Sequence, residues 1–395
     1  MILKYPYPYR AWLSIANDPD NTLLKDWREL DQLIWKELAL PLANSLFVRS
    51  YNRNLPGQVN LVDHPEIAAQ PHDTIHTWGD YMHAGARGFE RADALDAIQL
   101  LRSHRIQPRV WIDHAQFLGN LLHHHSLGAT PELKDMSGHK YPVLQYTLDL
   151  IEGLGIKYIW DGDVVELLGQ DRPLRPYPYF REVSTSEWKA AGKYALHMVA
   201  RKSAPARLGE IKVPSNEQYF PHRFPDGRIL YCFRRYGTWK EADIYGIHRL
   251  IAPENISRLL ALHASCIVYT HLGKRPADKV HLDHHVPENT RKAFEGLARR
   301  YKERELMISP VSAMLDYFVL RDHVRIKSHR IEFRADGIRF DRVEPVDLAG
   351  KKFSFTTHGL DPARASITAD GMEVAHHLIR ENDRVFSIEF PPITS

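Results

Sequence analysis

The sequence predicts an α/β fold: a (β/α) barrel with a small β module after it. Short apolar runs alternate with amphipathic helical stretches through the first part of the chain, which favours a parallel sheet. Histidine or aspartate follows several of these apolar runs. From Ile326 onward the pattern changes to short alternating runs with turn signals such as Ala335, Asp336 and Gly337, which are typical of antiparallel strands.

Apolar runs and helical spacing together define the expected elements. The expected strands cover residues 12–16, 45–48, 74–75, 109–112, 156–160 and 266–270. The expected helices cover residues 27–38, 92–101, 143–154 and 256–263. This order predicts alternating strand and helix units, as in a barrel.

Changes in this alternation of strand and helix patterns divide the chain into three parts. Residues 1–275 are the expected barrel, with a long insertion at about 168–253, where proline and tyrosine interrupt the pattern. Residues 276–325 are expected to be a helical connection, and residues 326–395 a small module resembling a β-sandwich.

The composition of the chain bears on which kinds of partner the protein binds. The 395 residues include 52 basic and 49 acidic side chains, a formal net charge of +3, which gives no reason to expect binding to nucleic acid or an anionic membrane. Cys232 and Cys266 lie far apart and form no metal-binding or redox motif. We expect no membrane span and, because the first residues lack a signal peptide's apolar core, a cytoplasmic location. Association into a homo-oligomer stays open.

Polar residues recur at the ends of the expected strands. The carboxyl ends of barrel strands meet on one face, and that face holds the active site. Six such residues are expected there: Asp18, Asp20, His76, His114, Asp161 and His271.

His76 and Asp80 are two metal-ligand side chains four residues apart in the segment 75–80. Together with a carboxylate from Asp18 or Asp20 they predict a divalent metal site with open positions. Such a site lowers the pKa of its water towards about 7 and can polarise a carbonyl group. The sequence therefore indicates metal-dependent hydrolysis.

The strand-end residues, in this order, resemble the polysaccharide deacetylase (NodB-homology, carbohydrate esterase family four) superfamily, over roughly residues 9–274 without the insertion. The resemblance implies a distorted (β/α) barrel that removes acetyl groups from carbohydrates with a divalent metal, often zinc. Asp18 resembles the family's catalytic base and Asp20 its metal-binding aspartate. The second family motif has two metal-binding histidines; His76 matches the first, and Asp80 stands in place of the second.

The later motifs of the family match this chain to different degrees. Where the family has a base-orienting arginine this chain has His114, which is expected to orient the base or bind metal. Trp160 and Asp161 resemble the pair that lines the pocket and tunes the acid, and Trp78 is a second expected pocket residue. His271 resembles the histidine that protonates the leaving group. A carbohydrate substrate and zinc follow from the resemblance.

Other interpretations of the same residues stay open. Asp18 and Asp20 are also typical of helix N-caps, and His76 of a half-buried structural histidine. A barrel with paired carboxylates is also compatible with a glycoside hydrolase, which needs no metal. The missing arginine motif and Asp80 are also compatible with a carbohydrate-binding pseudoenzyme.

Overall fold

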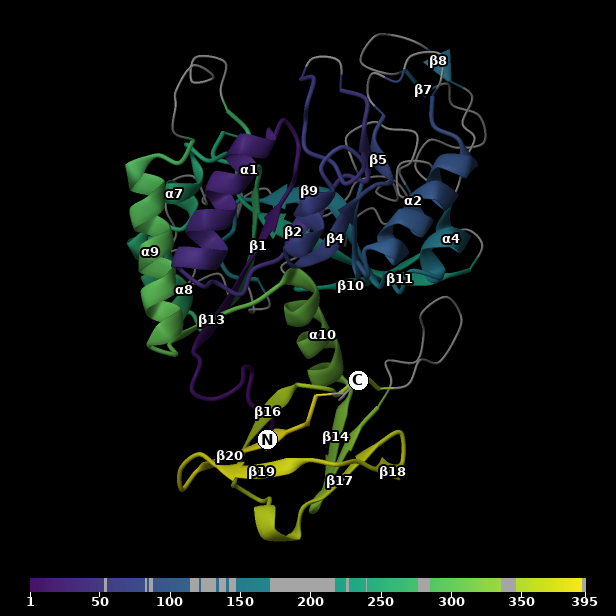
Figure 1. The fold of residues 1–395 in the computed structure, drawn as a ribbon. Coiled ribbons are helices and arrows are strands. Elements are labelled where there is room, and N and C mark those ends of the chain that lie inside the picture. The colour runs from purple at the N-terminus through teal and green to yellow at the C-terminus, as the bar shows by residue number, and fades with distance from the viewer. Residues whose placement is uncertain are drawn as a thin grey trace, which may run out of the picture.

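A curled sheet of parallel strands forms the centre of the protein (Figure 1). The computed structural model describes residues 1–52, 55–81, 84, 88–113, 121, 133–134, 140–141, 147–170, 217–224, 227–238, 240–275, 285–334 and 346–392. Eight strands follow in the order β13-β1-β12-β11-β9-β6-β4-β2, and β10 pairs with β11 in the antiparallel sense. The parallel α/β architecture is thereby confirmed.

The strands of this sheet are short. They are β1 (Ala11–Asn17), β2 (Asn44–Leu46), β4 (His72–His76), β6 (Val110–Ile112), β9 (Tyr158–Val165), β10 (Phe220–Arg223), β11 (Ile229–Tyr236), β12 (Ser265–Thr270) and β13 (Leu306–Ile308). Every residue of β1, β6, β11 and β12 is buried, as expected for parallel strands covered on both faces.

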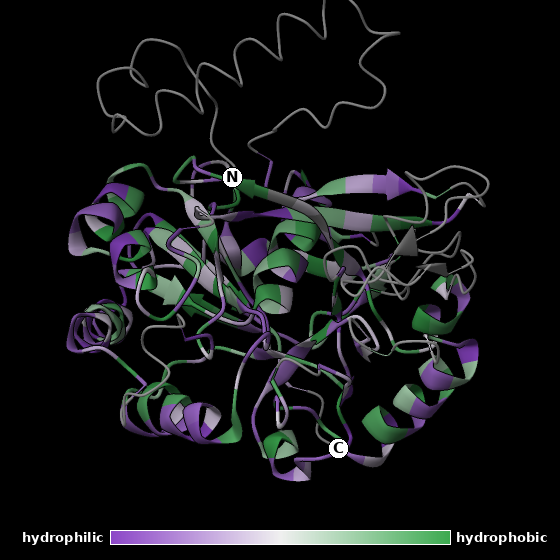
Figure 2. Cartoon of the chain, turned by 90° about the horizontal axis from the view of Figure 1, so that it is seen from above, coloured by the Kyte–Doolittle hydropathy of each residue, from purple (hydrophilic) through white to green (hydrophobic). Residues whose placement is uncertain are grey.

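Helices surround the sheet, as the view from above shows (Figure 2). They are α1 (Leu24–Leu30), its π-helical continuation (Asp31–Glu37), α2 (Arg91–Ser103), α4 (Leu148–Glu152), α7 (Ile247–Leu250), α8 (Pro253–Ala261), α9 (Glu288–Lys302) and α10 (Val311–Asp322). In α8 the buried residues Ile256, Leu259 and Leu260 form an apolar stripe on one side of the helix.

The curl of the sheet brings β1 close to β2. The side-chain amide of Asn17, at the end of β1, donates to Asn44 Oδ1 on β2 at 3.0 Å. Asn17 Oδ1 accepts from the backbone N–H of Leu272, just after β12. Among the residues described, no backbone ladder joins β1 to β2, so the sheet is a half-barrel and the expected complete barrel is not confirmed.

Two strands of the sheet lie in ranges to which the sequence assigned other roles. β11 lies inside the expected insertion, yet it is an inner strand between β9 and β12. β13 lies inside the expected helical connection and pairs with β1. Residues 171–216, most of the expected insertion, lie outside the described residues.

The C-terminal part is a β module below the sheet, joined to it by α10 (Figure 1). One small sheet has the order β14-β15-β17-β18 and the other β16-β20-β19, with one parallel pair, β15 with β17. The strands are β14 (Val324–Lys327), β15 (Arg330–Phe333), β16 (Lys352–Thr356), β17 (Ser366–Ala369), β18 (Met372–Glu373), β19 (His377–Arg380) and β20 (Val385–Glu389). The first residues of the chain pair with β16.

Short elements complete the fold: β3 (Arg49–Ser50) with β5 (Gly79–Asp80), β7 (Leu133–Lys134) with β8 (Lys140–Tyr141), and 3-10 turns at Pro65–Ala69 and Pro362–Arg364. Within the described ranges, the helices are all too short or too polar to cross a membrane.

Candidate metal centre

Asp18 and His271 meet because β1 and β12 are neighbouring parallel strands in register. Asn17 lies opposite Thr270, and the N–H of Asp18 extends the ladder by donating to the Thr270 carbonyl at 2.9 Å. The next residue on each chain therefore lies at the same carboxyl end of the sheet. His271 Nε2 lies 3.9 Å from Asp18 Oδ2.

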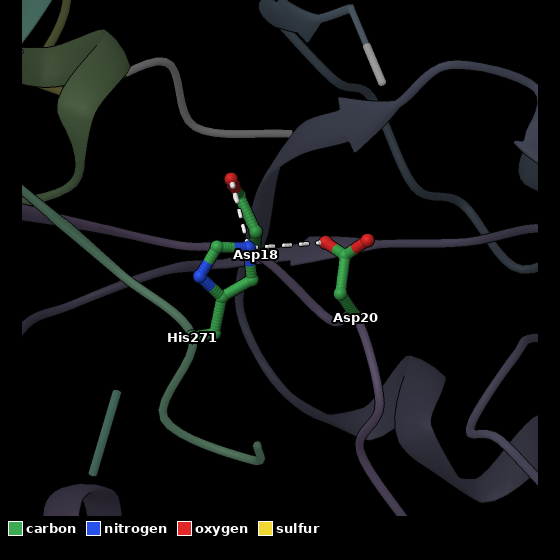
Figure 3. A group of neighbouring side chains, drawn as sticks. All are labelled: Asp18, Asp20 and His271. Carbon is green, nitrogen blue, oxygen red and sulfur yellow. Dashed lines mark ion pairs between the residues drawn. The ribbon is translucent and has the colours of Figure 1, made fainter. Parts of the chain in front are cut away.

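Asp20 and His76 complete a group of four side chains. Asp20 follows Asp18 in the turn after β1, and His76 is the last residue of β4. Asp20 Oδ2 lies 3.2 Å from His76 Nε2. It also lies 3.5 Å from His271 Nε2, and Figure 3 shows this contact. Asp18 Oδ2 lies 3.7 Å from His76 Nε2. The structure thus brings four of the six residues expected at this face close together.

The spacing of these atoms fits a metal ion. Asp18, Asp20 and His271 can each offer one ligand atom, and these atoms all lie within 4.8 Å of one another. Bonds of about 2.0–2.2 Å place adjacent ligand atoms roughly 3–3.5 Å apart in tetrahedral or octahedral geometry. The four nitrogen–oxygen distances run from 3.2 to 3.9 Å, so small side-chain shifts would bring them into that range. This group could hold a metal ion.

Arg235 was not among the residues singled out from the sequence. It lies near the end of β11 with a fully buried side chain, and its Nη1 donates to both carboxylate oxygens of Asp18, at 2.8 and 2.9 Å. The guanidinium carbon lies 3.5 Å from the ring centre of Trp160 and 4.3 Å from that of Tyr269. Two aromatic faces thus hold the cation beside Asp18.

These contacts set the charges of the centre. Burial alone would raise the pKa of Asp18, but the positive charges of Arg235, His76 and His271 lower it to about 2. Burial alone would lower the pKa of His76, but Asp20 and Asp18 raise it to about 9 when no metal is bound. Asp18 is therefore ionised throughout the range in which proteins are stable.

His271 is oriented by its second ring nitrogen. Nδ1 lies 3.1 Å from the carbonyl oxygen of Ala242, an acceptor, so Nδ1 carries the proton. The backbone N–H of His271 donates to the same carbonyl at 2.9 Å. With Nδ1 held by Ala242, the neutral ring offers Nε2 as its ligand atom when a metal ion is bound, the arrangement found in metal-binding histidines with a carbonyl partner.

Asp80 was expected as a metal ligand, but the structure places it in another network. Its Oδ2 accepts a hydrogen bond from Gln58 Nε2 at 2.8 Å, and its strand β5 pairs with β3. The chain turns sharply between His76 and Asp80, with φ of 49° at Thr77 and 155° at Gly79. This turn directs Asp80 towards Gln58, and the metal group contains His271 where Asp80 was predicted.

The remaining predicted residues have different outcomes. Trp78, expected in the pocket, is fully buried, donates to Thr147 Oγ1 at 2.9 Å and packs in the core. Trp160 is buried over Arg235. The expected strand end at Asp161 is displaced, because β9 continues to Val165; the Asp161 side chain and all of His114 lie outside what the structure describes.

A cavity of about 430 Å³ has Gln58 in its wall. The wall combines polar side chains with the ring of Tyr51 and with apolar side chains; the polar ones include Ser50, Asn52, Asn60 and Asp63, and the apolar ones Leu55, Pro56 and Ala84. Gln58 connects the cavity to the centre, because its Oε1 accepts from the backbone N–H of Asn21, the residue after Asp20.

Fold and site together define a curled parallel α/β sheet with a largely buried Asp-Asp-His group at the carboxyl ends of its strands. Comparisons with protein-family models, with curated proteins and with solved structures find no match for this chain.

Proposed function

We propose that this protein is a divalent-metal-dependent hydrolase that removes acetyl groups from an amino-sugar-containing glycan or glycan precursor. The observation that carries the proposal is the pairing of Asp18 with Arg235 within 4 Å of two histidines at the sheet edge. It supplies a carboxylate that is ionised at neutral pH next to a group of metal-ligand atoms. The resemblance to the polysaccharide deacetylases at Asp18, Asp20 and His76 supports the same activity.

Asp20, His76 and His271 are the proposed ligands, and zinc suits their one oxygen and two nitrogen donors. When bound, the ion supplies an activated water and polarises the acetyl carbonyl. His271 is better suited to this role than to proton delivery, because Nδ1 is committed to Ala242 and Nε2 faces Asp20.

Asp18 is the proposed proton carrier. Arg235 keeps its carboxylate ionised and fixed, so that it can accept the proton of the attacking water. The same carboxyl group can then deliver that proton to the leaving nitrogen or oxygen. Each transfer contributes roughly a hundred- to ten-thousand-fold to the rate in other enzymes.

A carbohydrate substrate is supported by the cavity that Gln58 lines. Its wall combines the aromatic ring of Tyr51 with a few polar groups and with apolar side chains, a mixed lining that suits a small polar ligand with apolar faces. A glycoside hydrolase is less well supported, because it needs a protonated carboxyl group, whereas the pKa of Asp18 is about 2.

Metal content and acetate release test the proposal together. Wild-type protein prepared without chelator, then offered zinc, cobalt or nickel, should retain about one ion per chain and release acetate from acetylated amino-sugar oligomers. Asp20→Ala should lose both properties. Asp383→Ala, which changes an exposed aspartate of the β module, is the matched control and should retain both. A wild-type protein that retains no ion would refute the metal-dependent mechanism.

A further inference from the structure

The side chain of Gln58 forms four hydrogen bonds beside the proposed metal centre. It is buried, with 2% of its surface exposed. Oε1 accepts from the backbone N–H of Asn21 at 2.9 Å and from Asn52 Nδ2 at 3.0 Å. Nε2 donates to Ser50 Oγ at 3.0 Å and to Asp80 Oδ2 at 2.8 Å. Both lone pairs and both N–H groups of the carboxamide are therefore used.

The partners leave only one orientation for this carboxamide. A backbone N–H is a donor only, so an oxygen must face Asn21; an ionised carboxylate is an acceptor only, so the NH₂ group must face Asp80. A glutamate at position 58 would satisfy Asn21 but would place a second negative charge against Asp80.

Asn21 shapes the turn that presents Asp20. The N–H of Thr22 donates to the carbonyl of Pro19 at 3.2 Å, which closes a four-residue turn. Asn21 is the third residue of this turn and has φ of 55°, the sign found in type II turns. In such turns the peptide between the second and third residues can flip to the type I orientation. Here that peptide joins Asp20 to Asn21.

We propose that Gln58 is a positioning residue for the metal centre, an inference that rests on the proposed function. By accepting from the N–H of Asn21, Gln58 holds the Asp20–Asn21 peptide in the orientation that directs the Asp20 carboxylate towards His76 and His271. Asp80 acts through Gln58, because the Asp80 carboxylate fixes which way the Gln58 carboxamide faces.

Zinc dissociation constants of the chelator-treated protein test this role. Gln58→Glu should weaken zinc binding by about ten- to a hundred-fold, the range for partners of metal ligands. Adding Asp80→Asn to this variant should restore most of the affinity, because the carboxamide introduced by the second substitution can donate to the carboxylate introduced by the first. Gln32→Glu is the matched control: Gln32 is exposed and donates to Glu37, so the substitution creates a similar pair of carboxylates away from the centre.

A second measurement does not depend on the metal. Crystal structures of the metal-free wild type and of Gln58→Met, which has similar size but no hydrogen bonds, should show positive φ at Asn21 in the wild type and negative φ in the variant. An unchanged Asn21 in Gln58→Met, or wild-type zinc affinity in Gln58→Glu, would overturn the positioning role. A wild-type protein without zinc affinity would instead refute the proposed function, and the crystal structures would still decide the role of Gln58.

Discussion

Arg235 and Asp18 form a buried ion pair between residues 217 positions apart in the sequence. One nitrogen, Nη1, serves both carboxylate oxygens, while the rest of the guanidinium lies against Trp160 and Tyr269. A carboxylate buried at the end of β1 is costly unless a cation accompanies it. Arg235 therefore compensates the charge of Asp18 inside the fold, and in the proposed mechanism it keeps that carboxylate ionised.

Removing Arg235 should be strongly destabilising. Arg235→Met leaves Asp18 buried without its main counter-charge, and we expect a loss of about 3–5 kcal/mol in the free energy of unfolding, measured with urea at pH 7. The double variant Asp18→Asn with Arg235→Met should recover part of that loss. Arg234→Met is the control, since Arg234 is also buried but lies over Phe220. Equal losses in Arg234→Met and Arg235→Met would contradict the ion-pair argument.

The stability of the metal-free protein should fall as pH rises from 6.5 to 9. His76 has a pKa of about 9 in the folded chain and 6.5 ordinarily, so the folded state binds its proton more tightly. That stabilisation is fully present below pH 6.5 and lost as pH rises through 9, by up to about 3 kcal/mol. Urea unfolding at both pH values measures it. His76→Gln should remove most of this dependence; an identical slope in the variant would show that His76 does not cause it.

Metal content of single variants should separate the ligands from their neighbours. His271→Ala and His76→Ala should each lose the ion, because each removes a nitrogen within 3.5 Å of Asp20 Oδ2. Asp80→Asn should retain it, because the carboxamide oxygen introduced by this substitution can still accept from Gln58. Mass spectrometry of the intact protein reports the result. Retention by His271→Ala together with loss by Asp80→Asn would restore the ligand set predicted from the sequence.

Gly273 should be essential for the approach of two loops. A Cβ atom there would lie 1.9 Å from Oγ1 and 2.4 Å from Cβ of Thr22, which lies two residues after Asp20. Gly273→Ala should therefore separate the loops that carry Asp20 and His271 and weaken zinc binding, measured by titration calorimetry. Adding Thr22→Gly should restore affinity. Gly296→Ala is the control, because no atom lies within 4 Å of its added Cβ. Wild-type zinc affinity in Gly273→Ala would show that the two loops can accommodate the added methyl group without moving Asp20 away from His271.

Periodic patterns made much of this architecture predictable. The strands before Asp18 and His271 are buried and largely apolar, whereas β4, which ends at His76, is buried but mostly polar. Parallel strands bring their carboxyl ends to one edge. Because these rules are local, four residues of the centre could be identified from the sequence alone.

Arg235 and Asp80 show where such rules stop. Arg235 lies in β11, a strand inside a range without clear periodicity, and only the pairing of β11 with β9 shows that the strand is internal. An arginine inside an apolar run was the available signal. For Asp80, the spacing from His76 suggested a shared site, but the left-handed turn at Thr77 and Gly79 directs the chain away. Backbone turns of this kind depend on contacts across the fold.

The position of β1 has a consequence for how the protein is made. This strand pairs on one side with β12 and on the other with β13, the last two strands of the sheet to be synthesised. At roughly 5–20 residues per second, a ribosome needs on the order of ten to sixty seconds to add them. During that delay the apolar segment Ala11–Asn17 has neither neighbour, so the nascent chain carries an exposed strand prone to pairing with other chains.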